Sequence, residues 1–203
     1  MQMIPSQDEV LQLLRDTGAL RTGHFVYPNG LHSDMALQIP LAFRHYQHAK
    51  VLSVALSRLV RSNPELRAAI SELSIVCPAT GGLPVAFGIC EALRAKKVYW
   101  GERENEREPL HFRQFHAVEP GEKVLLVDDI LRTGKKLMEL KSLVEAGGAN
   151  VVGLAVIIHQ PTPDTPDFRP LPFYSLAKLD AMYFLDPEEA KCKFPGDPLK
   201  LFP

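Results

Sequence analysis

The sequence has few cysteines, no long apolar run and no excess of one charge sign. The three cysteines, Cys77, Cys90 and Cys192, form no CxxC pair and are odd in number, so free thiols in a reducing cytosol are expected rather than a disulfide framework. The formal net charge is −1. Because binding to nucleic acid or to an acidic membrane surface requires an excess of basic residues, we expect neither as a main partner.

Segments that could enter a membrane are missing as well. The longest apolar runs, such as VVGLAVII at 151–158, are far shorter than the roughly 20 residues that a helix needs to span a bilayer. The initial segment MQMIPSQDEV lacks the charged and apolar regions of a signal peptide. The sequence therefore predicts a cytoplasmic protein with no membrane segment.

What is present is typical of a globular protein with a full core: 203 residues, of which 46% are hydrophobic and 23% charged. Short runs that are apolar throughout alternate with stretches of helical periodicity. This pattern predicts an α/β fold whose parallel sheet is covered by helices on both faces, with ligands beyond the carboxyl ends of the strands. The expected strands are 74–77, 97–100, 124–127 and 151–158, and the expected helices are 83–94 and 135–146.

The flanking segments carry their own signals. SQDE at 6–9 is a capping box that predicts the start of a helix. Residues 24–38 predict two short strands around an Asn-Gly turn, and a helix of period 3.6 is expected from about 44 to 61. The five prolines of 161–172 predict a stiff connector.

The stretch KVLLVDDILRTGKK at 123–136 carries the strongest chemical signal. A buried strand leads directly to two carboxylates, Asp128 and Asp129, at the expected ligand edge. Because side chains alternate along a strand, we expect the two carboxylates to point different ways. One of them can face the hydroxyls of a sugar while the other supports a metal or orders a loop.

The residues after this acid pair suit a phosphate. Thr133 and Gly134 lead into a helix, whose first N–H groups are free and whose amino end is partially positive. Gly134 allows the backbone to approach a ligand closely. Positive charge is added by Arg132, Lys135 and Lys136. The whole stretch therefore predicts a site for a sugar phosphate.

Plainer interpretations remain open. A strand ending in Asp-Asp also occurs as a Walker B strand, although no GxxxxGK[ST] loop accompanies it here, and as a solvated strand end. GERENEREP at 101–109 has the alternating charge of a solvated loop, but its place after an expected strand favours the ligand edge. The pairs His45–His48 and His111–His116 have no cysteine or carboxylate at ligand spacing, which predicts surface histidines rather than a metal site.

VLLVDDILRTGKK resembles the signature with which type I phosphoribosyltransferases bind phosphoribosyl pyrophosphate (PRPP). That signature is four apolar residues, two acids, two apolar residues and T-T-G-G-T/S. In this sequence Arg132 replaces the first threonine and Lys135-Lys136 replace the last two positions. The matching residues are Asp128, Asp129, Thr133 and Gly134.

Other segments are similar to the orotate phosphoribosyltransferases of that family, over about residues 6–203. CPATGG at 77–82 resembles their pyrophosphate loop. WGEREN with the following LHFRQF, within 100–115, resembles their flexible catalytic loop and hairpin. Residues 23–38 resemble the segment beside the orotate, and the stretch from Pro172 onward resembles their tail, where only Cys192 remains of a frequent C-x-x-C pair.

The resemblance implies the type I phosphoribosyltransferase fold for a single domain of residues 1–203. In this fold a parallel sheet flanked by helices forms the core, expected at about 43–164. A small hood subdomain comes from the N- and C-terminal segments, expected at about 18–42 and 165–203.

The resemblance also implies an activity: transfer of 5-phosphoribose from PRPP to orotate, with Mg²⁺ as cofactor, in a homodimer. Asp128 and Asp129 would lie near the ribose hydroxyls and a hydrated Mg²⁺. The 5′-phosphate would be held by Ile130, Leu131, Arg132, Thr133, Gly134, Lys135 and Lys136. The pyrophosphate would be bound by Thr80, Gly81, Gly82, Arg103 and Arg107, with Arg103 arriving on a mobile loop as a catalytic residue. The base would contact Phe25, Tyr27 and His159.

Two alternatives stay open. Related orotate enzymes carry Asp-Arg after the fourth strand, and the arginine holds the orotate carboxylate, whereas this chain has His159-Gln160. A neutral amide cannot replace a bidentate arginine–carboxylate pair, so the accepted base could be another nucleobase, or another cation could serve. The second alternative is a regulator that binds PRPP without catalysis.

Overall fold

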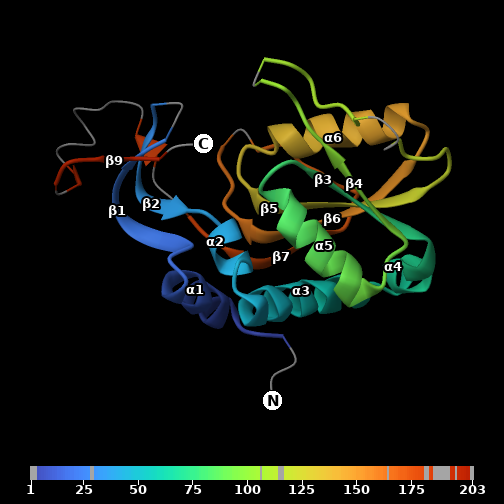
Figure 1. Cartoon of the computed structure of the whole chain (residues 1–203), viewed down its shortest axis with the longest axis horizontal. Coiled ribbons are helices and arrows are strands. Elements are labelled where there is room, and N and C mark those ends of the chain that lie inside the picture. Colours follow the sequence, from blue (N-terminus) through green and yellow to red (C-terminus); the bar gives the residue numbers. More distant parts are fainter. Residues whose placement is uncertain are drawn as a thin grey trace.

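The larger of two sheets forms the centre of the protein (Figure 1). The computed structural model describes residues 4–27, 30–105, 107–113, 117–163, 165–180, 183–184, 193–194 and 196–201. The strand order of the larger sheet is β4-β3-β5-β6-β7, and every pairing in it is parallel. Its strands are β3 (Leu73–Pro78), β4 (Lys97–Gly101), β5 (Lys123–Leu131), β6 (Asn150–His159) and β7 (Phe173–Lys178). The predicted α/β class and its four strands are confirmed, and β7 is an additional strand.

Helices cover both faces of this sheet. One face packs against α1 (Gln7–Asp16), α3 (Tyr46–Arg61) and α5 (Gly82–Leu93), and the other packs against α6 (Lys135–Ala146) (Figure 1). The short helices α2 (Pro40–Phe43), α4 (Pro64–Ala69) and the 3₁₀ turn η1 (Ile70–Glu72) complete the first layer. Successive side chains of β5 pack on opposite faces of the sheet: Leu125 lies in the core beneath α3 and α5, and Leu126 lies in the core beneath α6. Both faces of the strand are therefore buried, which explains its unbroken apolar run.

Sequence signals at the helix ends correspond to caps. The side chain of Ser6 accepts from the Glu9 N–H and the Ser6 N–H donates to the Glu9 carboxylate, so the predicted capping box begins α1. Asn63 caps α4, and its side-chain oxygen accepts from two backbone N–H groups of that helix. Of the helices described, none is both long and apolar enough to cross a membrane.

The smaller sheet has the order β8-β2-β1-β9 and stands beside the core, at the left of Figure 1. β1 (Leu20–Val26) and β2 (His32–Leu37) form the predicted antiparallel pair, whose expected Asn29 turn lies outside the described residues. The C-terminal segment adds β8 (Tyr183–Phe184) and β9 (Leu199–Lys200). Segments from both ends of the chain thus meet in one sheet.

The boundary expected between core and hood needs one correction. Residues 165–203 were expected in the hood as a block, but β7 pairs with β6 in the larger sheet. The reason is that β6 would have an unpaired edge without β7. Pairing with β6 also buries the apolar side chains of Leu176 and Ala177 in the core. Only the segment after β7 contributes strands to the smaller sheet.

Candidate active site

A cavity of about 330 Å³ opens at the carboxyl ends of β3 and β5. It lies where the loop between β3 and α5 meets the loop between β5 and α6, at the edge where the fold predicts a ligand. The lining residues are Pro78, Ala79, Gly81, Asp128, Asp129, Ile130, Leu131, Arg132, Thr133, Gly134, Lys135, Lys136 and Leu137. The structure therefore brings together the whole stretch 128–136 and one residue, Gly81, of the predicted pyrophosphate loop. Thr80 and Gly82 flank Gly81 but do not line the cavity.

The two carboxylates lie against the same loop, which corrects the expectation that they point different ways. A Cβ atom on Gly81 would stand 2.6 Å from Oδ2 of Asp129, and one on Gly82 would stand 3.1 Å from Oδ1 of Asp128. The cause is that the loop after β3 packs against the end of β5, with Gly81 next to Asp129 and Gly82 next to Asp128. Glycine is required at 81 because any side chain there would displace Asp129.

Burial sets the electrostatics of this pair. Asp128 is almost fully buried, and burial together with the neighbouring Asp129 carboxylate raises the pKa of Asp128 well above its usual value. Burial likewise raises the pKa of Asp129, opposed by hydrogen bonds and by the charges of Arg132 and Lys136. Each carboxylate accepts one backbone N–H: Asp128 from the Asp129 N–H at 2.8 Å, and Asp129 from the Ile130 N–H at 2.8 Å. Such a pair favours a ligand that supplies hydroxyl donors or a cation.

The amino end of α6 forms the other end of the cavity. Gly134 precedes the helix with a φ of 67°, and Thr133, Lys135 and Lys136 around it are exposed. The sequence explained Gly134 by close approach to a ligand, but a Cβ there would meet Pro166 at 2.7 Å. The proline-rich connector therefore packs against the loop from outside, and Thr165 also donates its hydroxyl to the Arg132 carbonyl.

Arg132 has a different surrounding from the lysines. Its Nε donates to Oε1 of Gln160 at 2.6 Å, and its Nη2 donates to the hydroxyl of Tyr27 at 3.1 Å. Gln160 is 1% exposed and was not selected from the sequence as a site residue. A signal was present, since Gln160 is a polar residue that directly follows β6 at the ligand edge.

Of the residues expected to contact the base, none lines this cavity. Phe25 is buried in the smaller sheet, where the guanidinium of Arg21 lies 5.5 Å from its ring centre. The ring of His159 packs edge-on against Phe173 at 4.9 Å, and burial lowers the pKa of His159. Tyr27 contacts Arg132, which is one of the lining residues.

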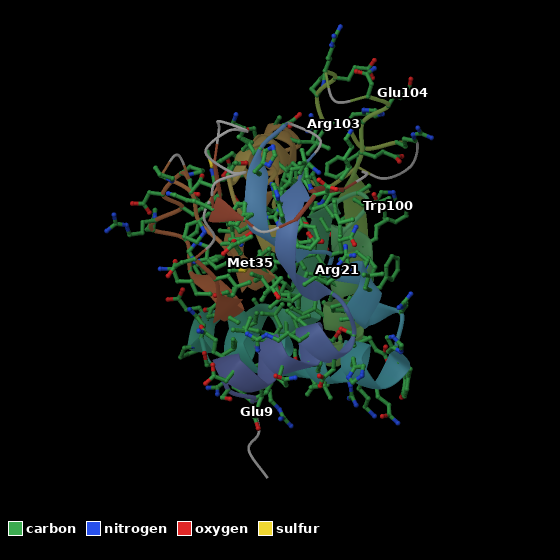
Figure 2. The ribbon with its side chains drawn as sticks, turned by 90° about the vertical axis from the view of Figure 1, so that its left-hand side faces the viewer. Glu9, Arg21, Met35, Trp100, Arg103 and Glu104 are labelled. Atoms are coloured by element: carbon green, nitrogen blue, oxygen red, sulfur yellow. The ribbon has the colours of Figure 1, made fainter. Side chains whose placement is uncertain are left out.

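The cationic residues of the segment after β4 also lie elsewhere. Arg103 and Glu104 stand on the loop that projects beyond the sheet (Figure 2). Nη2 of Arg103 is 2.5 Å from Oε2 of Glu139 on α6, and Glu139 also accepts the Leu110 N–H. Arg107 is exposed. In this conformation neither arginine lines the cavity.

The donor set fits a cation that is held indirectly. Among the described residues there is no group of three or more His, Cys, Asp or Glu side chains that could bind a metal. Mg²⁺ usually keeps several waters and takes only one or two carboxylates together with substrate oxygens. The adjacent carboxylates of Asp128 and Asp129 have the chemistry that such indirect binding would need.

Comparison with known proteins places these features in one family of sequences. The sequence model of the phosphoribosyl transferase domain matches residues 52–170, which include every residue that lines the cavity. An orotate phosphoribosyltransferase of Thermotoga maritima is 33% identical over 185 residues, covering 91% of this chain and 92% of the relative. One from Acidithiobacillus ferrooxidans is 34% identical over 194 residues, covering 95% of each.

Solved structures agree in fold. The crystal structure of orotate phosphoribosyltransferase from Aeropyrum pernix superposes with a TM-score of 0.66 at 20% identity, covering 84% of this chain and 93% of that one. An adenine phosphoribosyltransferase from Rhodothermus marinus gives a TM-score of 0.60 at 18% identity, covering 83% of this chain and 99% of that one. The predicted parallel sheet with its flanking helices is thus a known architecture.

Proposed function

Because this chain belongs to the phosphoribosyl transferase family, we propose that it transfers 5-phosphoribose from PRPP to orotate. The C1–O bond to pyrophosphate breaks and a C1–N bond to the base forms, giving orotidine 5′-phosphate and pyrophosphate. The curated relatives that support orotate as the acceptor match this chain over nearly its whole length. The observation that carries the proposal is the single cavity shared by Gly81, the acid pair and the cationic turn.

Each part of the cavity suits one part of PRPP. The acids Asp128 and Asp129 suit the ribose hydroxyls, since carboxylates accept such donors. The amino end of α6, with Thr133, Lys135 and Lys136, suits the 5′-phosphate. The loop of Thr80, Gly81 and Gly82 suits the pyrophosphate, because a glycine-rich backbone can bring its N–H groups close. No side chain needs to act as nucleophile, so catalysis depends on orientation and charge stabilisation.

Mg²⁺ belongs to this proposal as the cofactor. The acid pair would hold it through water and through PRPP oxygens, and it would neutralise charge on the departing pyrophosphate. The chain itself supplies two carboxylates whose buried position raises their pKa values, so that a nearby cation favours their ionised form. Arg103 would assist by leaving Glu139 and contacting the pyrophosphate, with Arg107 from the same loop.

A homodimer is also part of the proposal. Large apolar side chains are exposed on α3 and α5, with Tyr46 at 76% and Phe87 at 55%, and a second copy could cover them. Light scattering coupled to size exclusion should give twice the chain mass, and Phe87→Glu should shift the protein toward the monomer. The free thiols Cys77 and Cys90 are consistent with a cytoplasmic enzyme.

The direct test is enzymatic. Incubation with PRPP, Mg²⁺ and orotate should consume the absorbance of orotate and release one pyrophosphate per orotidine 5′-phosphate. PRPP binding without turnover of any base, at high enzyme concentration, would instead indicate a regulator.

Transfer to another nucleobase is the second candidate. It is favoured by the buried Gln160, which directly follows β6 and, as a neutral amide, offers no positive charge to the carboxylate of orotate. A panel of purines and pyrimidines, each offered with PRPP and Mg²⁺, separates this candidate from the first.

A further inference from the structure

Arg132 is held by two segments that are far from it in sequence. Its Nε donates to Gln160 at 2.6 Å and its Nη2 donates to Tyr27 at 3.1 Å, while its Cζ lies 4.9 Å from the centre of the Tyr27 ring. These contacts hold the guanidinium beside the residues that directly follow β1 and β6. Arg132 is nevertheless one of the residues that line the cavity.

Both partners of Arg132 are themselves fixed. The Tyr27 hydroxyl donates its proton to the Met35 carbonyl at 3.1 Å, so it meets Arg132 with a lone pair. Gln160 is 1% exposed, and its backbone N–H donates to the Leu131 carbonyl at 2.8 Å. The guanidinium is therefore positioned before a ligand arrives, which lowers the entropic cost of binding.

The charge of Arg132 is not neutralised by these partners. An amide oxygen and a phenol are both neutral, and within the described ranges no carboxylate forms an ion pair with Arg132. Arg103 and Arg113 are paired with Glu139 and Glu102, respectively. An arginine has five N–H donors, and toward the described part of the chain Arg132 uses two of them, on Gln160 and Tyr27, so three remain for a ligand. A half-buried cation in this state is suited to an anion in the cavity.

Resting on the proposed function, we propose that Arg132 binds the carboxylate of the base and is the residue that selects a carboxylated pyrimidine. The phosphate of PRPP already has a separate cationic end, formed by α6, Lys135 and Lys136. The planar fork of a guanidinium matches a carboxylate in bidentate geometry. The side chain of Arg132 thus binds the base, whereas the loop backbone around it binds the 5′-phosphate.

The test uses uracil, which lacks the carboxylate, as the comparison base. In Arg132→Gln, kcat/KM for orotate should fall about 100-fold, the value expected for loss of a charge-assisted pair. The value for uracil should fall far less, and the dissociation constant of PRPP, measured by calorimetry, should change less than about threefold. Lys135→Gln is the control: it should weaken PRPP binding and leave the orotate-to-uracil ratio unchanged.

A second variant separates recognition from structure. Gln160→Glu keeps the shape but gives Arg132 a carboxylate partner, so the protein should remain folded, with an unchanged or higher melting temperature, and should lose preference for orotate. A purely structural role of Arg132 predicts an unchanged orotate-to-uracil ratio in this variant. A role in 5′-phosphate binding predicts that Arg132→Gln raises the PRPP dissociation constant and lowers kcat/KM for orotate and for uracil by the same factor. Either result overturns the inference.

Failure of the inference and failure of the proposed function give different results. If the wild-type protein does not turn over orotate, the proposed function is wrong. If it does and either variant keeps the wild-type orotate-to-uracil ratio, the function stands and the role of Arg132 is wrong.

Discussion

The carboxylate of Asp129 lies directly beneath Gly81, so that a Cβ on Gly81 would stand 2.6 Å from Oδ2 of Asp129. Asp129 belongs to β5 and Gly81 to the loop between β3 and α5, and their proximity joins the acid pair to the predicted pyrophosphate loop. The site therefore depends on the absence of a side chain as much as on the acids themselves.

Gly81→Ala tests this contact. Because overpacking costs about 1–3 kcal/mol, the variant should bind PRPP about 10-fold more weakly in calorimetry. Gly88→Ala is the matched control. Gly88 lies on α5 and does not line the cavity, and its Cβ would meet the Ser53 hydroxyl at 2.2 Å. Gly88→Ala should lose stability and keep PRPP affinity; equal PRPP affinity in both variants would contradict the prediction.

Asp128→Asn should make the metal-free protein more stable and less active. Burial raises the pKa of Asp128 above its unfolded value near 3.8, so the folded state retains the proton longer and stability is lost as pH rises through the folded pKa. An amide avoids this cost and can still accept the Asp129 N–H. The melting temperature in EDTA should exceed that of the wild type by a few degrees, about 2–4 °C per kcal/mol, and the difference should grow from acidic to neutral pH. A lower melting temperature at neutral pH would show that the carboxylate stabilises the fold.

Asp129→Asn should weaken PRPP binding with little loss of fold. The carboxylate is part of the cavity lining, and an amide accepts hydroxyl donors and a hydrated cation less strongly. Titration calorimetry with PRPP and Mg²⁺ should show a dissociation constant about 10-fold higher, with an unchanged circular dichroism spectrum. Unchanged affinity would remove Asp129 from the site.

Gly134→Ala probes the packing of the proline-rich connector. Its φ of 67° disfavours a side chain by about 1–2 kcal/mol, and Pro166 would lie 2.7 Å from the new Cβ. Gly121→Ala is the control, because Gly121 has a φ of 80° with no atom within 4 Å. In urea unfolding, Gly121→Ala should lose about 1 kcal/mol and Gly134→Ala clearly more, and only the latter should bind PRPP more weakly. Equal losses of stability in Gly134→Ala and Gly121→Ala would mean that the connector at Pro166 moves aside at little energetic cost.

Arg103→Ala should lower turnover and leave PRPP binding nearly unchanged. In the structure Arg103 is paired with Glu139, so any contact with the pyrophosphate forms late, after the loop has moved. Steady-state kinetics should show kcat reduced about 10-fold or more. Arg113→Ala, which removes the exposed pair with Glu102, serves as the control for a general change in loop charge. A turnover number equal to that of the wild type refutes the role of Arg103.

Much of the fold followed from local patterns in the sequence. The expected strand at 124–127 and helix at 135–146 correspond to β5 and α6, and the helix at 44–61 corresponds to α3. Periodicity sets these elements because burial of apolar side chains repeats with the geometry of the backbone. β7 was missed because its sequence was assigned to the hood, and which sheet edge accepts a strand is decided by long-range pairing.

The sequence by itself determined that an acid pair, a threonine-glycine turn and two lysines would follow a buried strand, because these residues are neighbours in the chain. Only the tertiary structure decided where the side chains point. Both acids lie against the loop at Gly81 and Gly82, and Arg132 turns to Gln160, 28 positions away, and to Tyr27, 105 positions away. The physical reason is that backbone hydrogen bonds and burial periodicity are local, whereas the partner of a polar side chain is chosen by the packing of segments remote in sequence.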